Sequence, residues 1–132
     1  MPTIPWIGAA QVSADPAFAM VSRFRLRRRR DVVPFFISAL RIHNQMRRSS
    51  GILGLSLVAR PLRREFLTLS AWDDRESLMA AVLDEPHRRA MERFRAAMDD
   101  STFDYWSLSA SELPIPWPTA MARLERGQAN TR

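Results

Sequence analysis

Hydrophobic and polar positions recur along this chain with two different periods. A period of two residues, typical of strands with two distinct faces, runs through "FAMVSRFRL" (18–26), "FLTLSAW" (66–72) and "TFDYWSLSA" (102–110). The segment "ILGLSLVAR" (52–60) is apolar at most positions, which indicates a strand covered on both faces. The pattern therefore predicts four strands.

The helical period appears first after residue 30. Asp31 is suited to cap a helix, Pro34 is tolerated in its first turn, and Gly51 is a stop signal. At about 100° per residue, one arc of this helix is predicted to be apolar: Val33, Phe36, Ile37, Leu40 and His43, with Ala39, Ile42 and Met46 widening it.

A second helix is predicted after the third strand. Asp73 or Asp74 can cap it, and Pro86 should break it. The helix then resumes with His87 at the head of a second apolar stripe, which continues through Met91, Phe94 and Met98.

The order of these elements is β-α-β-β-α-β. This order predicts an α+β, ferredoxin-like domain over residues 18–111, with an antiparallel sheet and two helices on one face. Residues 1–17 hold three prolines and are predicted to form an irregular arm, and residues 112–132 a Pro-rich tail with a short helix near Met121–Leu124.

The two faces of the predicted sheet differ in character. The small aliphatic face, with Leu67, Leu69 and Ala71, is suited to helices. The other face would be uncovered in a monomer and too large an apolar patch to leave in water; it carries Phe18, Phe24, Phe66, Trp72, Phe103 and Tyr105. We therefore expect a homodimer that stacks these faces, with the tail residues Ile115 and Trp117 as a clamp over the partner or a cavity mouth.

Composition removes several kinds of chemistry. The chain has 132 residues, no Cys and no Lys, since all 20 basic residues are Arg. Disulfides, thiolate nucleophiles, thiolate metal ligands and Schiff-base lysines are therefore excluded. No apolar run approaches the roughly 20 residues that span a bilayer, and the N-terminus lacks a signal-peptide pattern, so we expect no membrane contact and a cytoplasmic location.

The basic run Arg27–Arg30, in a chain of net charge +6, raises the question of nucleic-acid binding. RNA-recognition domains share the predicted element order, but their third strand needs glycines and paired aromatics that "REFLTLSAW" lacks. A solvated turn, or a rim that attracts an anionic ligand, is the better interpretation, and nucleic acid is an unlikely partner.

Two segments resemble a known group of proteins. "EFLTLSAWDDRESLMAAVLDEPHRRAMERF" followed by "FDYWSLSASEL" is similar to antibiotic-biosynthesis-monooxygenase-like families of the dimeric α/β-barrel superfamily. The resemblance covers residues 18–111 and implies a cavity between sheet and helices. In such families some members oxygenate aromatic or polyketide-like molecules without a cofactor, and others bind and degrade haem. By position, Trp72 matches their strand-end tryptophan and His87 their helix histidine.

The candidate site follows from these residues. His87 could act as a base on a phenolic proton or, alternatively, ligate haem iron; the plainer interpretation is a helix-start histidine bonded to the Asp84–Glu85 turn. The other substrate contacts that we predict are Trp72, Tyr105, His43, Phe66, Ser70, Phe103 and Arg89. With no His-x₃-His or Glu-x-x-His spacing, no metal site is predicted.

The favoured function is a cofactor-independent monooxygenase-like enzyme that acts on an aromatic or polyketide-like small molecule in the cavity between sheet and helices. A non-catalytic ligand-binding or structural dimer and a haem protein are the alternatives. A dry cavity too small for a ligand would favour the structural alternative.

Overall fold

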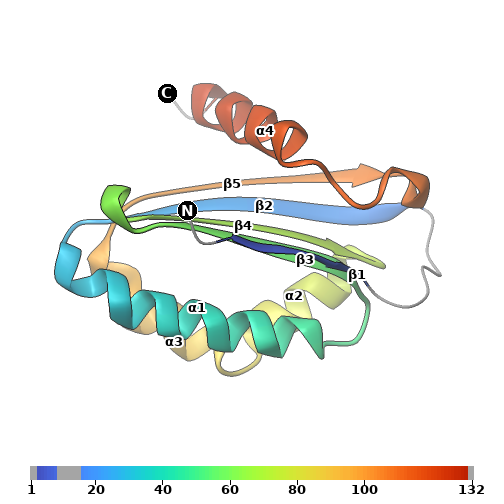
Figure 1. Cartoon of the computed structure of the whole chain (residues 1–132). Helices are drawn as coiled ribbons and strands as arrows, with labels where there is room; N and C mark the ends of the chain where they lie inside the picture. The colour runs from blue at the N-terminus through green and yellow to red at the C-terminus, as the bar shows by residue number, and fades with distance from the viewer. Residues whose placement is uncertain (1–2, 9–15, 131–132) are drawn as a thin grey trace.

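The computed structural model describes residues 3–8 and 16–130 and confirms the α+β, ferredoxin-like prediction (Figure 1). The helices and strands are β1 Thr3–Gly8, β2 Ala17–Leu26, α1 Val32–Arg47, β3 Ile52–Arg60, β4 Glu65–Trp72, α2 Arg75–Leu83, α3 His87–Phe94, β5 Met98–Leu108 and α4 Trp117–Asn130. Short 3₁₀ turns lie at Arg29–Asp31, Pro61–Arg63, Arg95–Ala97 and Ala110–Glu112.

The sheet is antiparallel, with the strand order β1-β3-β4-β2-β5. Strands β2, β3, β4 and β5 have the ferredoxin-like order, and β1 extends the sheet beside β3. Cross-strand register places Ser22 opposite Thr68 and Met20 opposite Tyr105. Residues from β2, β4 and β5 therefore share the face that builds the site.

The prediction of an irregular arm over residues 1–17 is wrong for its first part. Thr3–Gly8 form β1, which pairs with β3 from Thr3 opposite Val58 to Gly8 opposite Gly54. The Trp6 ring lies where a Cβ on Gly54 would be, so this glycine gives the ring its place. A six-residue strand containing Pro5 has too little alternation to detect, and residues 1–2 and 9–15 of the arm lie outside the described residues.

The prediction of which sheet face the helices cover is also wrong. Helices α1, α2 and α3 lie on one side of the sheet and α4 lies on the other (Figure 1). Phe35 of α1 and Phe94 of α3 pack with Phe24 and Phe66, so helices of the same chain cover the aromatic face. The rings of the helices fit between the rings of the strands, and the apolar character of each face taken alone does not show this fit.

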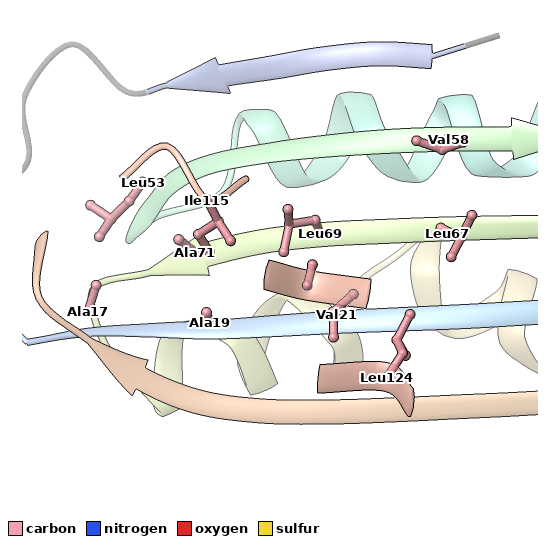
Figure 2. Packing of buried hydrophobic residues seen from close by; sticks show 11 residues of the cluster. Ala17, Ala19, Val21, Leu53, Val58, Leu67, Leu69, Ala71, Ile115 and Leu124 are labelled. Atoms are coloured by element: carbon pink, nitrogen blue, oxygen red, sulfur yellow. The ribbon is translucent and has the colours of Figure 1, made fainter. Parts of the chain in front are cut away.

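The C-terminal tail covers the small aliphatic face. Ile115 and Leu124 are buried against the strands, with side chains among Ala19, Val21, Leu69 and Ala71 (Figure 2). The Trp117 Nε1–H donates to Ser56 Oγ at 3.2 Å, and the Arg123 guanidinium lies 4.9 Å from the Trp106 ring centre. The expected short helix is thus longer, and Ile115 and Trp117 clamp their own sheet and not the cavity mouth.

We expect Leu124→Ala to destabilise the fold by about 2–4 kcal/mol, because it removes a fully buried side chain between α4 and the sheet. Urea unfolding measures this difference. Glu125→Ala, at the exposed neighbouring position, is the matched control and should leave the free energy of unfolding nearly unchanged. Equal stability of both variants would show that α4 contributes little to the fold.

The helix ends follow the predicted signals with one exception. Asp74 caps α2 by accepting from the Ser77 backbone N–H at 2.8 Å, and α2 and α3 are separated at Pro86 as predicted. Asp31 makes no capping hydrogen bond, because it already has helical dihedral angles at the end of the 3₁₀ turn. The run Arg27–Arg30 is exposed, as expected of a solvated connection.

The apolar arc of α1 is rotated relative to the prediction. Phe35 is buried although it lies outside the predicted arc, and Met46 is buried as predicted. Val33, Ile37 and Leu40 are exposed, with 65% of Val33 accessible. Apolar residues surround most of this helix, so the sequence pattern does not define a single centre. The buried side is set by the fit of Phe35 against Phe66 and Phe94.

Candidate active site

A cavity of about 360 Å³ lies between the sheet and helices α1–α3. This volume is within the usual range for small-molecule sites, so the cavity is large enough for a ligand. Its lining comes from six elements besides α2: Met20, Ser22 and Phe24 on β2; Phe35, Ser38, Ala39, Ile42, His43 and Met46 on α1; Leu55, Ser56 and Leu57 on β3; Phe66, Thr68, Leu69 and Ser70 on β4; His87, Ala90, Met91 and Phe94 on α3; and Phe103 and Tyr105 on β5, with Val82 from α2.

The cavity is strongly apolar and holds no formal charge. No Arg, Asp or Glu is among the lining residues within the described ranges. A charged group buried there would lose its hydration without gaining a charged partner. The cavity is therefore suited to an uncharged ligand.

His43 faces the cavity from α1. Its Nε2 is buried and has no hydrogen-bond partner. Burial lowers the pKa of His43 below its ordinary value of 6.5, and the positive charge of Arg47, one turn further along the helix, lowers it in addition. His43 is therefore a neutral imidazole at neutral pH.

His87 faces the same cavity from the start of α3. Its Nδ1 is buried without a hydrogen-bond partner, and its backbone N–H donates to Gln45 Oε1 at 3.1 Å. Burial lowers the pKa of His87, and an interaction with the Val82 backbone partly opposes the shift. The Asp84–Glu85 turn bonds the two residues after His87 instead: Arg88 N–H donates to the Asp84 carbonyl and Arg89 N–H to Glu85 Oε2.

The two lowered histidine pKa values predict how stability depends on pH. A histidine whose pKa is lower in the folded state binds protons more weakly there than in the unfolded chain. Its contribution to the free energy of unfolding is therefore complete above pH 6.5 and is lost as the pH falls below 6.5. We expect the free energy of unfolding to fall on this acidification, and to fall less in His87→Asn. Urea titrations at several pH values measure both slopes; identical slopes would contradict the burial of this imidazole.

Three of the hydroxyl groups in the cavity already have a hydrogen-bond partner. Ser22 Oγ and Thr68 Oγ1 bond to each other across β2 and β4. Ser70 Oγ accepts from the Trp72 Nε1–H at 2.9 Å. In contrast to these hydroxyls, one buried nitrogen of each imidazole has no partner.

The predicted contacts on β5 lie at the open side of the cavity. Phe103 and Tyr105 both line it, yet remain 39% and 44% exposed. Phe103 lies against Phe24 with ring centres 5.5 Å apart, and Tyr105 stacks on Phe18 at 6.0 Å. β5 is an edge of the described sheet, so these two rings border the entrance.

Two of the predicted contacts lie away from the cavity. Trp72 is fully buried and packs with Met46, Leu55 and Leu78. Its indole N–H donates to Ser70 Oγ, and the indole itself does not line the cavity. Arg89 points to solvent, with 83% of its side chain exposed and Glu85 as its nearest acidic group at 4.0 Å. The structure thus brings together His43, His87, Phe66, Ser70, Phe103 and Tyr105.

Gln45 of α1 is not among the residues predicted for the site. Its Nε2 donates to the Ala81 carbonyl at 2.9 Å, and its Oε1 accepts from the His87 backbone N–H. One amide side chain therefore holds the end of α2 and the start of α3 against α1. The sequence offers no local signal for this role, because the contact with His87 spans 42 residues.

Metal and membrane features are limited. Within residues 3–8 and 16–130, no three His, Asp or Glu side chains cluster as metal ligands would. None of the helices described there is long and apolar enough to cross a bilayer.

Comparison with solved structures identifies the fold. SnoaB, a cofactor-independent oxygenase from Streptomyces nogalater, superposes with a TM-score of 0.59 over 75% of this chain and 98% of its own, at 16% identity. Proteins assigned as antibiotic biosynthesis monooxygenases from Nitrosomonas europaea and Caulobacter crescentus give 0.62 and 0.60, at 10% and 12% identity, over 80% and 69% of this chain and 100% and 88% of theirs.

This chain has the fold of the antibiotic biosynthesis monooxygenases. The resemblance seen in the segment from Glu65 to Phe94 is therefore confirmed at the level of fold. No protein-family model and no curated protein sequence matches the chain. At these identities the comparisons show a shared fold.

Proposed function

We propose that this protein is a cofactor-independent oxygenase of a small aromatic or polyketide-like molecule. The observation that carries the proposal is an apolar cavity into which two neutral imidazoles bring unpaired, buried nitrogens. A neutral imidazole is a base suited to a phenol or an activated C–H group. The likeness in fold to SnoaB, which is named a cofactor-independent oxygenase, supports this choice.

In the proposed reaction, His87 takes a proton from the bound substrate. The resulting anion is electron-rich enough to reduce O₂, and the adduct is a hydroperoxide once a proton returns. For an anthrone-type substrate, elimination of water from this hydroperoxide leaves a quinone: one oxygen atom stays in the product and the other leaves as water. The substrate supplies the electrons, so the balance needs no further reductant.

The apolar lining would assist this chemistry in two ways. It excludes water, which would otherwise protonate the anion before the anion reacts with O₂. It also keeps His87 uncharged between turnovers, since burial disfavours the imidazolium. Trp72, behind Ser70, would hold the strand that forms the wall of the site.

The proposal is tested with anthrone and a panel of related hydroxylated anthrones. Oxygen uptake and quinone formation, followed together in the presence of a metal chelator and no added cofactor, should exceed the spontaneous oxidation of each compound with one O₂ consumed per quinone. Failure to accelerate any member of the panel would overturn the proposed reaction.

The lining residues do not fit haem. Haem carries two propionate carboxylates, and no Arg lines the cavity within the described ranges to pair with them. We therefore derive no step through haem, although His87 Nδ1 is an unpaired nitrogen. Titration with haem should produce no shifted Soret band; a saturable band lost in His87→Ala would reverse this conclusion.

We also propose a homodimer, formed along the open side of the cavity. β5 is an eleven-residue edge strand whose Phe103 and Tyr105 are partly exposed, and exposed strand edges favour pairing. A second copy there would close the entrance. Native mass spectrometry should give twice the chain mass, and Phe103→Glu should shift the population toward monomer; a parent that is monomeric at high concentration contradicts this.

A further inference from the structure

Two buried nitrogens without hydrogen-bond partners lie in the largely apolar wall of the cavity. His43 Nε2 and His87 Nδ1 are both buried and unpaired, and they come from two different helices. A buried polar atom without a partner costs free energy, which a ligand that hydrogen-bonds to it recovers. Two such atoms in one cavity therefore favour a ligand with two polar groups.

Gln45 links the elements that carry these two points. It lies on α1 two residues from His43, and its amide bonds both the Ala81 carbonyl, at 2.9 Å, and the His87 N–H, at 3.1 Å. Gln45 therefore contributes to the position of His87 relative to His43, together with the packing of Phe35 on Phe94. Loss of that amide would let α3 move against α1 without removing either imidazole.

The rest of the lining restricts the ligand further. Ser22 and Thr68 hydrogen-bond to each other, and Ser70 accepts from Trp72. The rings of Phe35, Phe66 and Phe94 form much of the apolar surface and suit a flat aromatic molecule. The absence of Arg, Asp and Glu from the described lining excludes a buried ionic group.

We propose that His43 and His87 recognise one substrate at two points, and that this substrate is an uncharged, flat, polycyclic molecule with two hydroxyl groups. Gln45 is a positioning residue that sets the separation of the two points. The inference rests on the proposed function only in taking the cavity as the substrate site.

Binding of stable quinones tests this specificity without any reaction. The probes are unsubstituted anthraquinone, a set of dihydroxyanthraquinone isomers that differ in hydroxyl spacing, and anthraquinone sulfonate. One net hydrogen bond is worth about five-fold in affinity, so the best-fitting isomer should bind about 25-fold more tightly than anthraquinone. The sulfonate should bind least tightly. Equal affinity for all isomers and anthraquinone would overturn two-point recognition.

Single variants separate recognition from packing. His43→Phe and His87→Phe should each weaken the best isomer about five-fold and leave anthraquinone unchanged. Gln45→Ala should reduce the preference for that isomer while the protein stays folded, and Asn44→Ala, at a neighbouring position on α1, should not. An equal loss for both probes in the histidine variants would indicate packing and contradict the proposal.

These measurements also distinguish two kinds of failure. The quinones are already oxidised and are measured without turnover, so a clear isomer preference with no anthrone oxidation would disprove only the oxygenase reaction. Anthrone oxidation with no isomer preference would disprove only the two-point recognition.

Discussion

His87→Ala should lower the rate of oxygen uptake on an accepted anthrone by about 10²–10⁴-fold, the usual contribution of a positioned general base. The backbone N–H of His87 is held by Gln45, and the Nδ1 of its imidazole has no partner and can take a proton. Steady-state oxygen consumption and quinone absorbance measure the change. The loss should appear in kcat, because proton removal occurs after binding.

The matched control for this experiment is Glu92→Ala. Glu92 lies on the same helix, is exposed, and its nearest basic group is Arg88 at 4.0 Å. It should retain the parent rate, and urea unfolding of both variants checks that each is folded. If His87→Ala kept full turnover on a confirmed substrate, His87 would not be the base.

Trp72→Ala should destabilise the protein by about 3–5 kcal/mol, the usual cost of removing a large aromatic side chain from a core. The side chain is completely buried among residues of α1, β3 and α2, and its N–H bonds Ser70. Denaturant unfolding measures the difference. A loss below about 1 kcal/mol would show that the surrounding core collapses into the space.

Trp72→Phe separates the two contributions of the indole. It keeps most of the apolar volume but leaves Ser70 Oγ without its donor, so a loss of about 1–2 kcal/mol is expected. If Trp72 were instead a wall of the substrate site, the variant would change the relative affinities of quinone probes. Because the indole lies outside the lining, we expect those relative affinities to stay the same.

Much of the candidate site could be predicted from local patterns. Alternation along β4 placed Phe66 and Ser70 on the cavity face, and alternation along β5 did the same for Phe103 and Tyr105. Trp72 shares that alternation with Phe66, but it lies at the end of β4, where α2 begins and covers it through Leu78. Alternation gives the side of a sheet and does not tell which part of that side is filled.

The sequence by itself determined the α+β class, the order of the core strands and helices, the break at Pro86 and the Asp74 cap, because periodicity, capping and proline geometry act between near neighbours. Only the tertiary structure decided that α1–α3 cover the aromatic face, that α4 covers the aliphatic one, and that Gln45 holds His87. These depend on the shapes of side chains that meet across dozens of residues, and a local pattern carries no record of such a fit.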